Sequence, residues 1–211
     1  VSKDPELEWV KREGIHFGVT KIPVYGMASS HAEFLVTYYT PEDGLILDSF
    51  SGRSTVLLAG LFHGRRVIGY DLCKQNLVKT EKVIKKHFEG VEDRYQLFHS
   101  DGIELEELKD YENHLDGVIF DPPYFLNCER YTKNMGEEDS RDLSNVTYEE
   151  YMIRMKKHFN HLYRLIKKSD FEKKEFYPVI SKVGTARRGT GGILDMSTDF
   201  QLAAKEAGFV V

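Results

Sequence analysis

Four short, mainly apolar runs, each leading to an aspartate, constrain the fold of this chain more than any other sequence feature. They are residues 45–47 before Asp48, residues 66–70 before Asp71, residues 95–99 before Asp101, and residues 115–120 before Asp121. Such runs are typical of buried strands, and helical patterns such as Lys74–Phe88 lie between them. Strands that alternate with helices predict an α/β domain with a doubly wound, mostly parallel sheet.

The positions of the four aspartates predict a binding site. The carboxyl ends of parallel strands meet at one edge of a doubly wound sheet, so all four carboxylates should line one crevice. Aspartate also suits turns, and a single one of them would do no more than end a strand. Four crowded carboxylates would repel one another unless a ligand supplied cations or hydrogen-bond donors, so together they favour a ligand site.

The segment after Asp48 indicates the kind of ligand. Residues 49–55 form a loop of mostly small residues, which would let a bulky ligand approach the backbone. Neither G-x-x-x-x-G-K-[ST] nor G-x-G-x-x-G occurs in the sequence, and Asp48 would repel a phosphate. We therefore expect a nucleoside without phosphates, with Asp71 on the ribose hydroxyls and Asp101 on an exocyclic amine or a ring N–H.

The last of the four runs continues as Asp121-Pro122-Pro123-Tyr124. Neither proline has an N–H, and Pro123 biases Pro122 toward an extended backbone. The segment is therefore a stiff shelf that offers one carboxylate, fixed carbonyls and an aromatic face to a flat molecule with an amino group. Alone, a four-residue match of this kind is equally consistent with a loop that ends a strand.

Two motifs together resemble the S-adenosylmethionine-dependent DNA amino-methyltransferases, which methylate N6 of adenine or N4 of cytosine. Residues 48–55 (D-S-F-S-G-R-S-T) resemble the D-P-F-x-G-x-G-T motif of that family, and residues 121–124 resemble its catalytic [DNS]-P-P-[YFW] motif. The resemblance covers residues 31–211, most of the chain. The sequence departs from the pattern at Ser49, which replaces a proline, and at Ser54, which replaces the second glycine.

The resemblance implies a Rossmann-like methyltransferase sheet of seven strands flanked by helices, whose last two strands form a hairpin. Residues 209–211 would begin that hairpin, so we expect the C-terminal strand hairpin to be truncated. Residues 28–211 would be the S-adenosylmethionine-dependent methyltransferase domain, and residues 1–27 an N-terminal extension.

The resemblance also implies the cofactor and the residues of the site. S-adenosyl-L-methionine would be the cofactor, and a base flipped out of DNA would be the methyl acceptor. The residues implied in catalysis are Asp121, Pro122, Pro123 and Tyr124. The residues implied in cofactor binding are Asp48, Ser49, Phe50, Ser51, Gly52, Asp71, Leu72, Asp101, Gly102 and Asp121.

The resemblance implies that the partner is DNA, as it is for the enzymes of restriction-modification and of other DNA methylation. The spacing between Asp71 and Asp121 leaves no room for a target-recognition domain. Recognition would then come from the loop after Tyr124, the N-terminus, residues beyond the C-terminus, or a separate specificity domain or subunit. The net charge of -5 argues against a surface coated for nucleic acid but not against a local basic patch. Arg187 and Arg188, in a predicted Gly/Arg loop, are candidates for phosphate contacts, although a solvated basic loop explains them equally well.

Three other functions are compatible with parts of this pattern. The acceptor could be an RNA base or a protein amide; glutamine methyltransferases favour asparagine at the position of Asp121, so the aspartate mildly favours a base. The chain could also be an inactive methyltransferase-like scaffold subunit, given its altered cofactor loop. A nicotinamide dehydrogenase is the least favoured, because its glycine fingerprint is absent.

The remaining composition excludes several classes of protein. The two cysteines, Cys73 and Cys128, form no C-x-x-C pair, and the histidines lack metal-ligand spacing, so we expect neither a disulfide framework nor a metal. The sequence has no apolar run approaching the ~20 residues that span a bilayer, so we expect no membrane association. The N-terminus lacks the apolar core of a signal peptide, and we expect a cytoplasmic protein.

Overall fold

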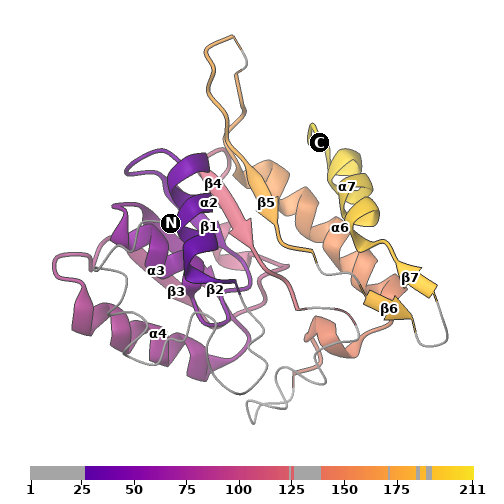
Figure 1. Cartoon of the computed structure of the whole chain (residues 1–211), viewed down its shortest axis with the longest axis horizontal. Helices are drawn as coiled ribbons and strands as arrows, with labels where there is room; N and C mark the ends of the chain where they lie inside the picture. The colour runs from indigo at the N-terminus through magenta and orange to yellow at the C-terminus, as the bar shows by residue number, and fades with distance from the viewer. Residues whose placement is uncertain (1–26, 124, 126–138, 171, 184–185, 189–191) are drawn as a thin grey trace.

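The computed structural model describes residues 27–123, 125, 139–170, 172–183, 186–188 and 192–211. Within these residues a five-stranded parallel sheet has helices on both faces (Figure 1), which confirms the expected doubly wound, Rossmann-like α/β fold. Its strands are β1 (Leu45–Asp48), β2 (Arg66–Tyr70), β3 (Tyr95–Phe98), β4 (Gly117–Phe120) and β5 (Val179–Ser181). The helices are α2 (Ser29–Tyr39), α3 (Thr55–Phe62), α4 (Lys74–His87), α6 (Tyr148–Leu165) and α7 (Met196–Ala207).

The strand order is β3-β2-β1-β4-β5, so the chain reverses its direction of travel across the sheet between β1 and β4. Leu47 of β1 pairs with Ile68 of β2 on one side and with Val118 of β4 on the other. All four pairings are parallel, so the carboxyl ends of the strands share one edge. A reversal of this kind leaves a crevice at the carboxyl ends of the two central strands, where such sheets bind ligands.

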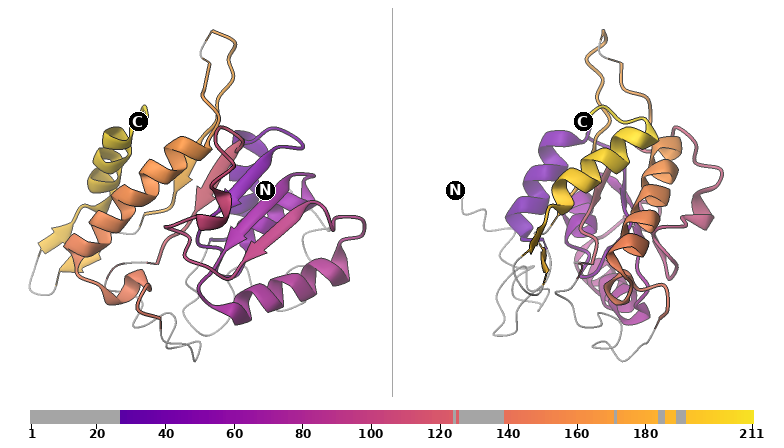
Figure 2. Two further views of the ribbon diagram at one scale, coloured as in Figure 1. Left: turned by 180° about the vertical axis from the view of Figure 1, so that it is seen from behind. Right: turned by 90° about the vertical axis from the view of Figure 1, so that its right-hand side faces the viewer.

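The central strands are buried on both faces. Ile46 and Ile119 pack with buried residues of α2 and α3 on one face. Leu47 and Phe120 pack with buried residues of α6 and α7 on the other. Figure 2 shows α6 and α7 together on one side of the sheet and α2 on the opposite side. Because successive side chains of a strand point to opposite faces, a continuous apolar run is what a strand buried on both sides requires.

Local signals in the sequence position the last two helices. The hydroxyl of Thr147 accepts a hydrogen bond from the backbone N–H of Glu150 at 3.2 Å, as expected for the N-terminus of α6. Tyr151, Met155 and other buried residues of α6 then form one apolar face. Helix α7 ends at Ala207 and is capped by Gly208, whose φ of 108° is favourable for glycine.

Two details of the sequence-based prediction are wrong. Residues 186–192 were expected to form a loop, but β6 (Ala186–Arg188) and β7 (Gly192–Leu194) form a separate antiparallel pair. The Gly/Arg composition of this segment is as typical of a short hairpin as of a loop. Residues 209–211 are described but form no strand.

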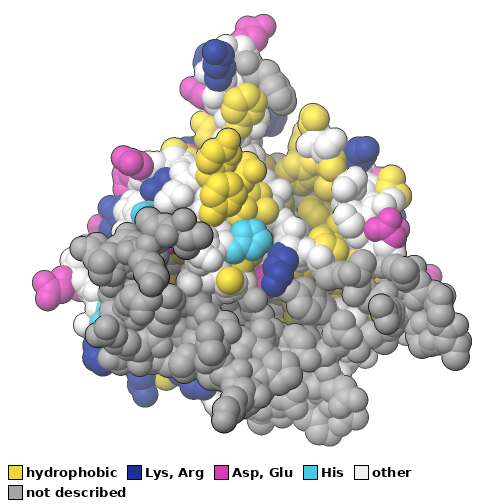
Figure 3. Space-filling model, viewed as in Figure 1, with side chains coloured by type: hydrophobic (Ala, Val, Ile, Leu, Met, Phe, Trp, Pro, Cys, Tyr) yellow, Lys and Arg dark blue, Asp and Glu magenta, His cyan; other side chains and the backbone are white. Residues whose placement is uncertain are grey.

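A cluster of exposed aromatic side chains lies on α2. The rings of Phe34, Tyr38 and Tyr39 contact one another, with centroids 4.9 to 6.1 Å apart. Figure 3 shows hydrophobic side chains gathered above the middle of this face of the molecule. Among the helices of the described residues, none combines the length and the apolar character needed to cross a bilayer.

Candidate functional site

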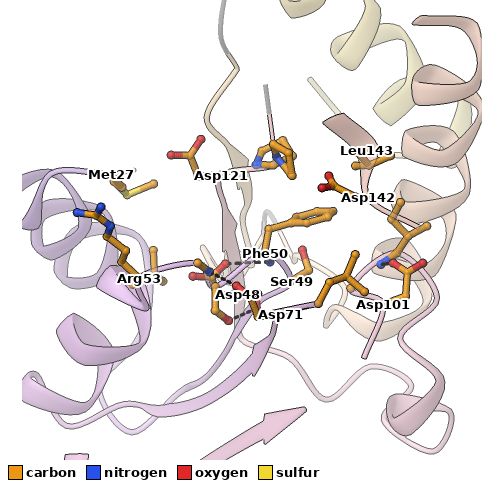
Figure 4. Close-up of a pocket in the computed structure, with 18 of the residues that line it drawn as sticks. Met27, Asp48, Ser49, Phe50, Arg53, Asp71, Asp101, Asp121, Asp142 and Leu143 are labelled. Carbon is orange, nitrogen blue, oxygen red and sulfur yellow. Dashed lines mark hydrogen bonds between the residues drawn. The ribbon is translucent and has the colours of Figure 1, made fainter. Parts of the chain in front are cut away.

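A pocket opens at the carboxyl edge of the sheet, at the reversal between β1 and β4 (Figure 4). It encloses about 960 Å³, a volume that includes its open mouth. Its lining is Met27, Asp48, Ser49, Phe50, Ser51, Gly52, Arg53, Thr55, Val56, Asp71, Leu72, Asp101, Gly102, Ile103, Asp121, Pro122, Pro123, Arg141, Asp142 and Leu143.

The structure brings the predicted site residues together around this one pocket. All four strand-end aspartates line it, and so does every residue that the sequence assigns to cofactor binding. Asp121, Pro122 and Pro123 also line it, whereas Tyr124 lies outside the described residues. Figure 4 shows Asp48 and Asp71 near the middle of the pocket, with Asp101 toward one end and Arg53 toward the other.

Asp48, at the end of β1, is the most deeply buried of these carboxylates. Its Oδ1 accepts a hydrogen bond from the backbone N–H of Phe50 at 3.2 Å. Burial raises the pKa of Asp48 well above its ordinary value, and the nearby negative charges of Asp121 and Asp71 raise it further. A bound cation or hydrogen-bond donor would relieve this cost, so the site is suited to a ligand with positive charge.

Asp71, beyond the end of β2, is held by backbone donors. Its two oxygens accept hydrogen bonds from the N–H groups of Gly52 and Cys73, both at 2.6 Å. The side-chain amide of Asn76 approaches the same carboxylate at 3.3 Å. Burial raises the pKa of Asp71 to about 6, although these hydrogen bonds act in the opposite direction. The carboxylate is therefore fixed in position between two loops of the pocket.

Asp101 follows β3 and lies where the pocket meets the segment before α6. It accepts a hydrogen bond from the backbone N–H of Ile103 at 2.9 Å. Burial raises the pKa of Asp101, while the positive charges of Arg141 and Arg154 lower it. Arg141 lines the pocket as well, and its guanidinium pairs with Asp139 through two hydrogen bonds at 3.0 and 2.7 Å.

The loop after Asp48 has a left-handed backbone at two positions, one of which is a serine. Gly52 has a φ of 50° and Ser54 a φ of 60°, so both are left-handed. Ser54 stands where the family pattern has a glycine, and its hydroxyl makes a buried hydrogen bond of 2.5 Å with the hydroxyl of Thr80. A left-handed serine costs about 1–2 kcal/mol, and this hydrogen bond offsets part of the cost.

The second substitution in the loop is supported from α6. The hydroxyl of Ser49, which replaces the proline of the pattern, lies 3.0 Å from Nε2 of His158. Burial lowers the pKa of His158 to about 3, so the imidazole is neutral. On the other side of the loop, a Cβ built on Gly102 would lie 1.7 Å from the carbonyl oxygen of Ser49. Glycine is therefore required at position 102.

The shelf that carries Asp121 is fixed from two directions. The hydroxyl of Tyr151 in α6 donates a hydrogen bond to the carbonyl of Pro123 at 3.1 Å. The ammonium of Lys182, directly after β5, lies 3.2 Å from Oδ2 of Asp121. The carboxylate therefore has a cationic neighbour on the adjacent strand.

Sequence reasoning missed several residues of the site. Met27, Arg53, Asp142 and Leu143 line the pocket but were not among the predicted site residues. Arg53 lies inside the first motif, which was a usable signal, whereas Lys182 depends on strand pairing that no local pattern reveals. Among the described residues, no group of three or more histidine, cysteine or carboxylate side chains could hold a metal ion.

Comparisons with known proteins identify the fold. No protein-family model matches the chain, and no curated protein matches it. Three solved structures each superpose with a TM-score of 0.55. A possible exported protein from Bordetella parapertussis is 12% identical and is matched over 87% of this chain and 60% of its own. Precorrin-6y C5,15-methyltransferase from Geobacter metallireducens GS-15 is 13% identical, over 92% of this chain and 76% of its own. The [4+2]-cyclase SpnF is 12% identical, over 92% of this chain and 64% of its own.

These similarities establish a Rossmann-like fold of the methyltransferase type. The chain spans less than two thirds of two of the three structures. One neighbour is named a methyltransferase and another a cyclase, so the fold by itself does not select a reaction.

Proposed function

We propose that the chain is an S-adenosyl-L-methionine-dependent methyltransferase that acts on the exocyclic amine of adenine or cytosine in DNA. One observation carries the proposal: the carboxylates of Asp48, Asp71 and Asp101 line the same pocket as Asp121, Pro122 and Pro123. On this proposal a cofactor site and an amine-binding shelf would adjoin, which is what direct methyl transfer between two bound molecules requires.

The chemistry of the pocket fits this cofactor. Asp71 would accept hydrogen bonds from the ribose hydroxyls, and Asp101 would accept one from the adenine amine. Asp48, whose raised pKa reflects burial among other negative charges, would gain from the positive charge of the ligand. The amino-acid part would then extend toward Arg53, at the opposite end of the pocket from Asp101 (Figure 4). When bound, the cofactor supplies an electrophilic methyl group on a sulfonium.

The protein's own task is to make a poor nucleophile reactive. The lone pair of an amine on a base is delocalised into the ring. A hydrogen bond from that amine to Asp121, and a second to the carbonyl of Pro122, would favour a tetrahedral nitrogen and restore the lone pair. The two prolines hold these acceptors rigidly, and Tyr151 holds the shelf from α6. A base in duplex DNA must first be flipped out of the helix to reach the shelf.

Substitution of Asp121 tests the proposal. The variant Asp121→Ala should lose methyl transfer to DNA by about 10²–10³-fold, because it removes an acceptor placed for the transition state. It should still bind S-adenosyl-L-methionine in calorimetry, because the other carboxylates of the pocket remain. The variant Asp110→Ala, at an exposed position, is the matched control.

Two outcomes would refute the proposal. Normal turnover by the Asp121→Ala variant would show that this carboxylate has no part in the reaction. Failure of the parent chain to bind the cofactor would favour the inactive scaffold. Labelled cofactor should be offered with duplex DNA, RNA and protein in parallel, because transfer only to RNA or to protein would reassign the acceptor.

A further inference from the structure

The ion pair between Lys182 and Asp121 lies at the edge of the proposed acceptor site. The ammonium nitrogen is 3.2 Å from Oδ2 of Asp121, and the two side chains are 34% and 15% exposed. Lys182 does not line the pocket itself. It therefore reaches the carboxylate from outside the space that the cofactor would fill.

Strand pairing, rather than chance packing, brings these two residues together. Strands β4 and β5 are parallel neighbours, and Phe120 is in register with Ser181. Asp121 and Lys182 each follow one of these paired residues, and the N–H of Lys182 donates to the carbonyl of Phe120 at 3.0 Å. Because paired strands lie about 4.8 Å apart, the two side chains emerge side by side from a rigid part of the sheet.

The other charges near Asp121 are mainly negative. Asp48, at the end of β1, is close enough that the charge of Asp121 raises its pKa, and Asp71 raises it as well. The loop before α3 contributes Arg53 to the same pocket, and the segment before α6 contributes Arg141, which pairs with Asp139. From α6, Tyr151 presents a neutral hydroxyl to the carbonyl of Pro123. Lys182 is thus the cation in contact with Asp121 among the described ion pairs.

We infer that Lys182 is a positioning residue that keeps Asp121 ionised and oriented to accept a hydrogen bond from the acceptor amine. A protonated carboxyl group would present a donor to the amine, which is the opposite of what activation requires. An ionised carboxylate has about four acceptor sites, so it can hold the lysine and the amine together. The inference rests on the proposed function and adds a residue outside both sequence motifs.

Three substitutions in the full chain test this role. Lys182→Met removes the charge and keeps much of the side-chain length, Lys182→Arg keeps the charge, and Lys168→Met removes an exposed lysine before β5 as the control. Methyl transfer to duplex DNA is measured from pH 5.5 to 9, and binding of S-adenosyl-L-methionine is measured by calorimetry.

An opposite charge at this distance favours the ionised form of a carboxyl group by one pH unit or more. For Lys182→Met, the acid limb of the kcat profile should therefore move upward by about one pH unit. On the acid side of that limb the rate should fall about tenfold, and well above it the rate should equal that of the parent. The dissociation constant of the cofactor should change by less than about threefold, because Lys182 does not line the pocket. Lys182→Arg should restore the parent profile, and Lys168→Met should leave it unchanged.

Two results of the activity measurements would overturn the inference. A Lys182→Met profile that overlays the parent profile would show that the ion pair does not affect catalysis. A loss of rate that is equal at every pH would assign Lys182 a purely structural role.

If the parent chain transfers no methyl group, the proposed function fails instead. The titration of the Asp121 carboxyl group, followed by NMR, then tests the inference. Lys182→Met should move that titration upward by about one pH unit, and an unmoved titration would overturn the inference.

Discussion

The hydroxyl of Ser49 lies 3.0 Å from Nε2 of His158, which joins the loop after β1 to helix α6. Both side chains are buried, and the imidazole also packs against the rings of Phe50 and Phe120. The loop therefore has a support from α6 at the position where the family pattern has a stiff proline. A serine at this position depends on a residue more than a hundred positions away in the sequence.

Replacement of His158 by leucine should destabilise the protein through Ser49. The variant leaves a buried hydroxyl without its partner, which costs about 1–3 kcal/mol of unfolding free energy. The double variant Ser49→Ala/His158→Leu replaces both partners by apolar groups and should recover most of that loss. Urea unfolding at pH 8 measures both. Equal stability of His158→Leu and the parent would show that the hydrogen bond contributes nothing.

The free energy of unfolding should depend on pH through the buried imidazole of His158. Burial lowers the pKa of His158 to about 3, so the unfolded chain binds more protons at this residue than the native chain between about pH 3 and 6.5. The free energy of unfolding of the parent therefore falls as the pH falls through that window. His158→Leu has no imidazole to titrate, so its free energy of unfolding does not fall in this way. The amount by which the variant is less stable than the parent should therefore shrink by about 2 kcal/mol between pH 8 and pH 5. A deficit that is constant with pH would mean that the imidazole is solvated.

Ser54 allows a second test of the cofactor loop. Its φ of 60° is costly for any residue with a Cβ, and its hydroxyl bonds to Thr80. Ser54→Ala loses the hydrogen bond and keeps the strain, whereas Ser54→Gly loses the hydrogen bond and relieves the strain. Urea unfolding should therefore find the glycine variant more stable than the alanine variant by about 1 kcal/mol. The reverse order would contradict the left-handed backbone at this position.

Much of the fold and the cofactor side of the site could be predicted from the sequence, because both depend on local patterns. A buried strand has an apolar run, and the edge of a parallel sheet collects whatever residue follows each run. The sequence therefore predicts that Asp48, Asp71, Asp101 and Asp121 share one crevice, and all four line the pocket. The loop between Asp48 and α3 was likewise predictable, because its small residues follow the strand directly.

The parts that sequence reasoning missed depend on contacts between distant segments. Lys182 reaches Asp121 because β5 pairs with β4, and His158 reaches Ser49 because α6 packs across the sheet. A lone lysine or histidine carries no local sign of such a partner. The pair β6 and β7 was missed because its composition, rich in glycine and arginine, is as typical of a loop as of a short hairpin.

Gly102 should tolerate no side chain. A Cβ at this position would lie 1.7 Å from the backbone carbonyl oxygen of Ser49, and a backbone atom cannot rotate away. Gly102→Ala must push the loops after β1 and β3 apart, which should cost about 1–3 kcal/mol of stability. It should also weaken binding of S-adenosyl-L-methionine at least tenfold in calorimetry, since both loops line the pocket. Ser100→Ala, two residues earlier, is the control, and unchanged binding by Gly102→Ala would contradict the close approach.

The ionised carboxylate of Asp71 should lower the free energy of unfolding of the ligand-free protein and should favour ligand binding. The effect on stability should depend on pH. Burial raises its pKa from 3.8 to about 6, so between about pH 4 and 6 the native chain binds more protons at this residue than the unfolded chain. The contribution of Asp71 to the free energy of unfolding is therefore full at low pH, is lost as the pH rises through 6, and does not return above it. The shift corresponds to about 3 kcal/mol, since each pH unit is worth 1.36 kcal/mol.

Asp71→Asn removes the ionisation, but its amide has one acceptor oxygen and can accept from only one of the N–H groups of Gly52 and Cys73. Loss of the other hydrogen bond offsets about 1–2 kcal/mol of the gain. In urea unfolding without ligand, the variant should therefore be more stable than the parent by about 1–2 kcal/mol at pH 8, and the advantage should vanish near pH 4. Its affinity for S-adenosyl-L-methionine at pH 8 should nevertheless fall about tenfold, because an amide accepts the ribose hydroxyls less strongly than a carboxylate does. Asp110→Asn, at an exposed position, should change neither quantity. A variant that is less stable than the parent at pH 8, or that binds the cofactor equally well, would show that the carboxylate of Asp71 is not held charged for a ligand.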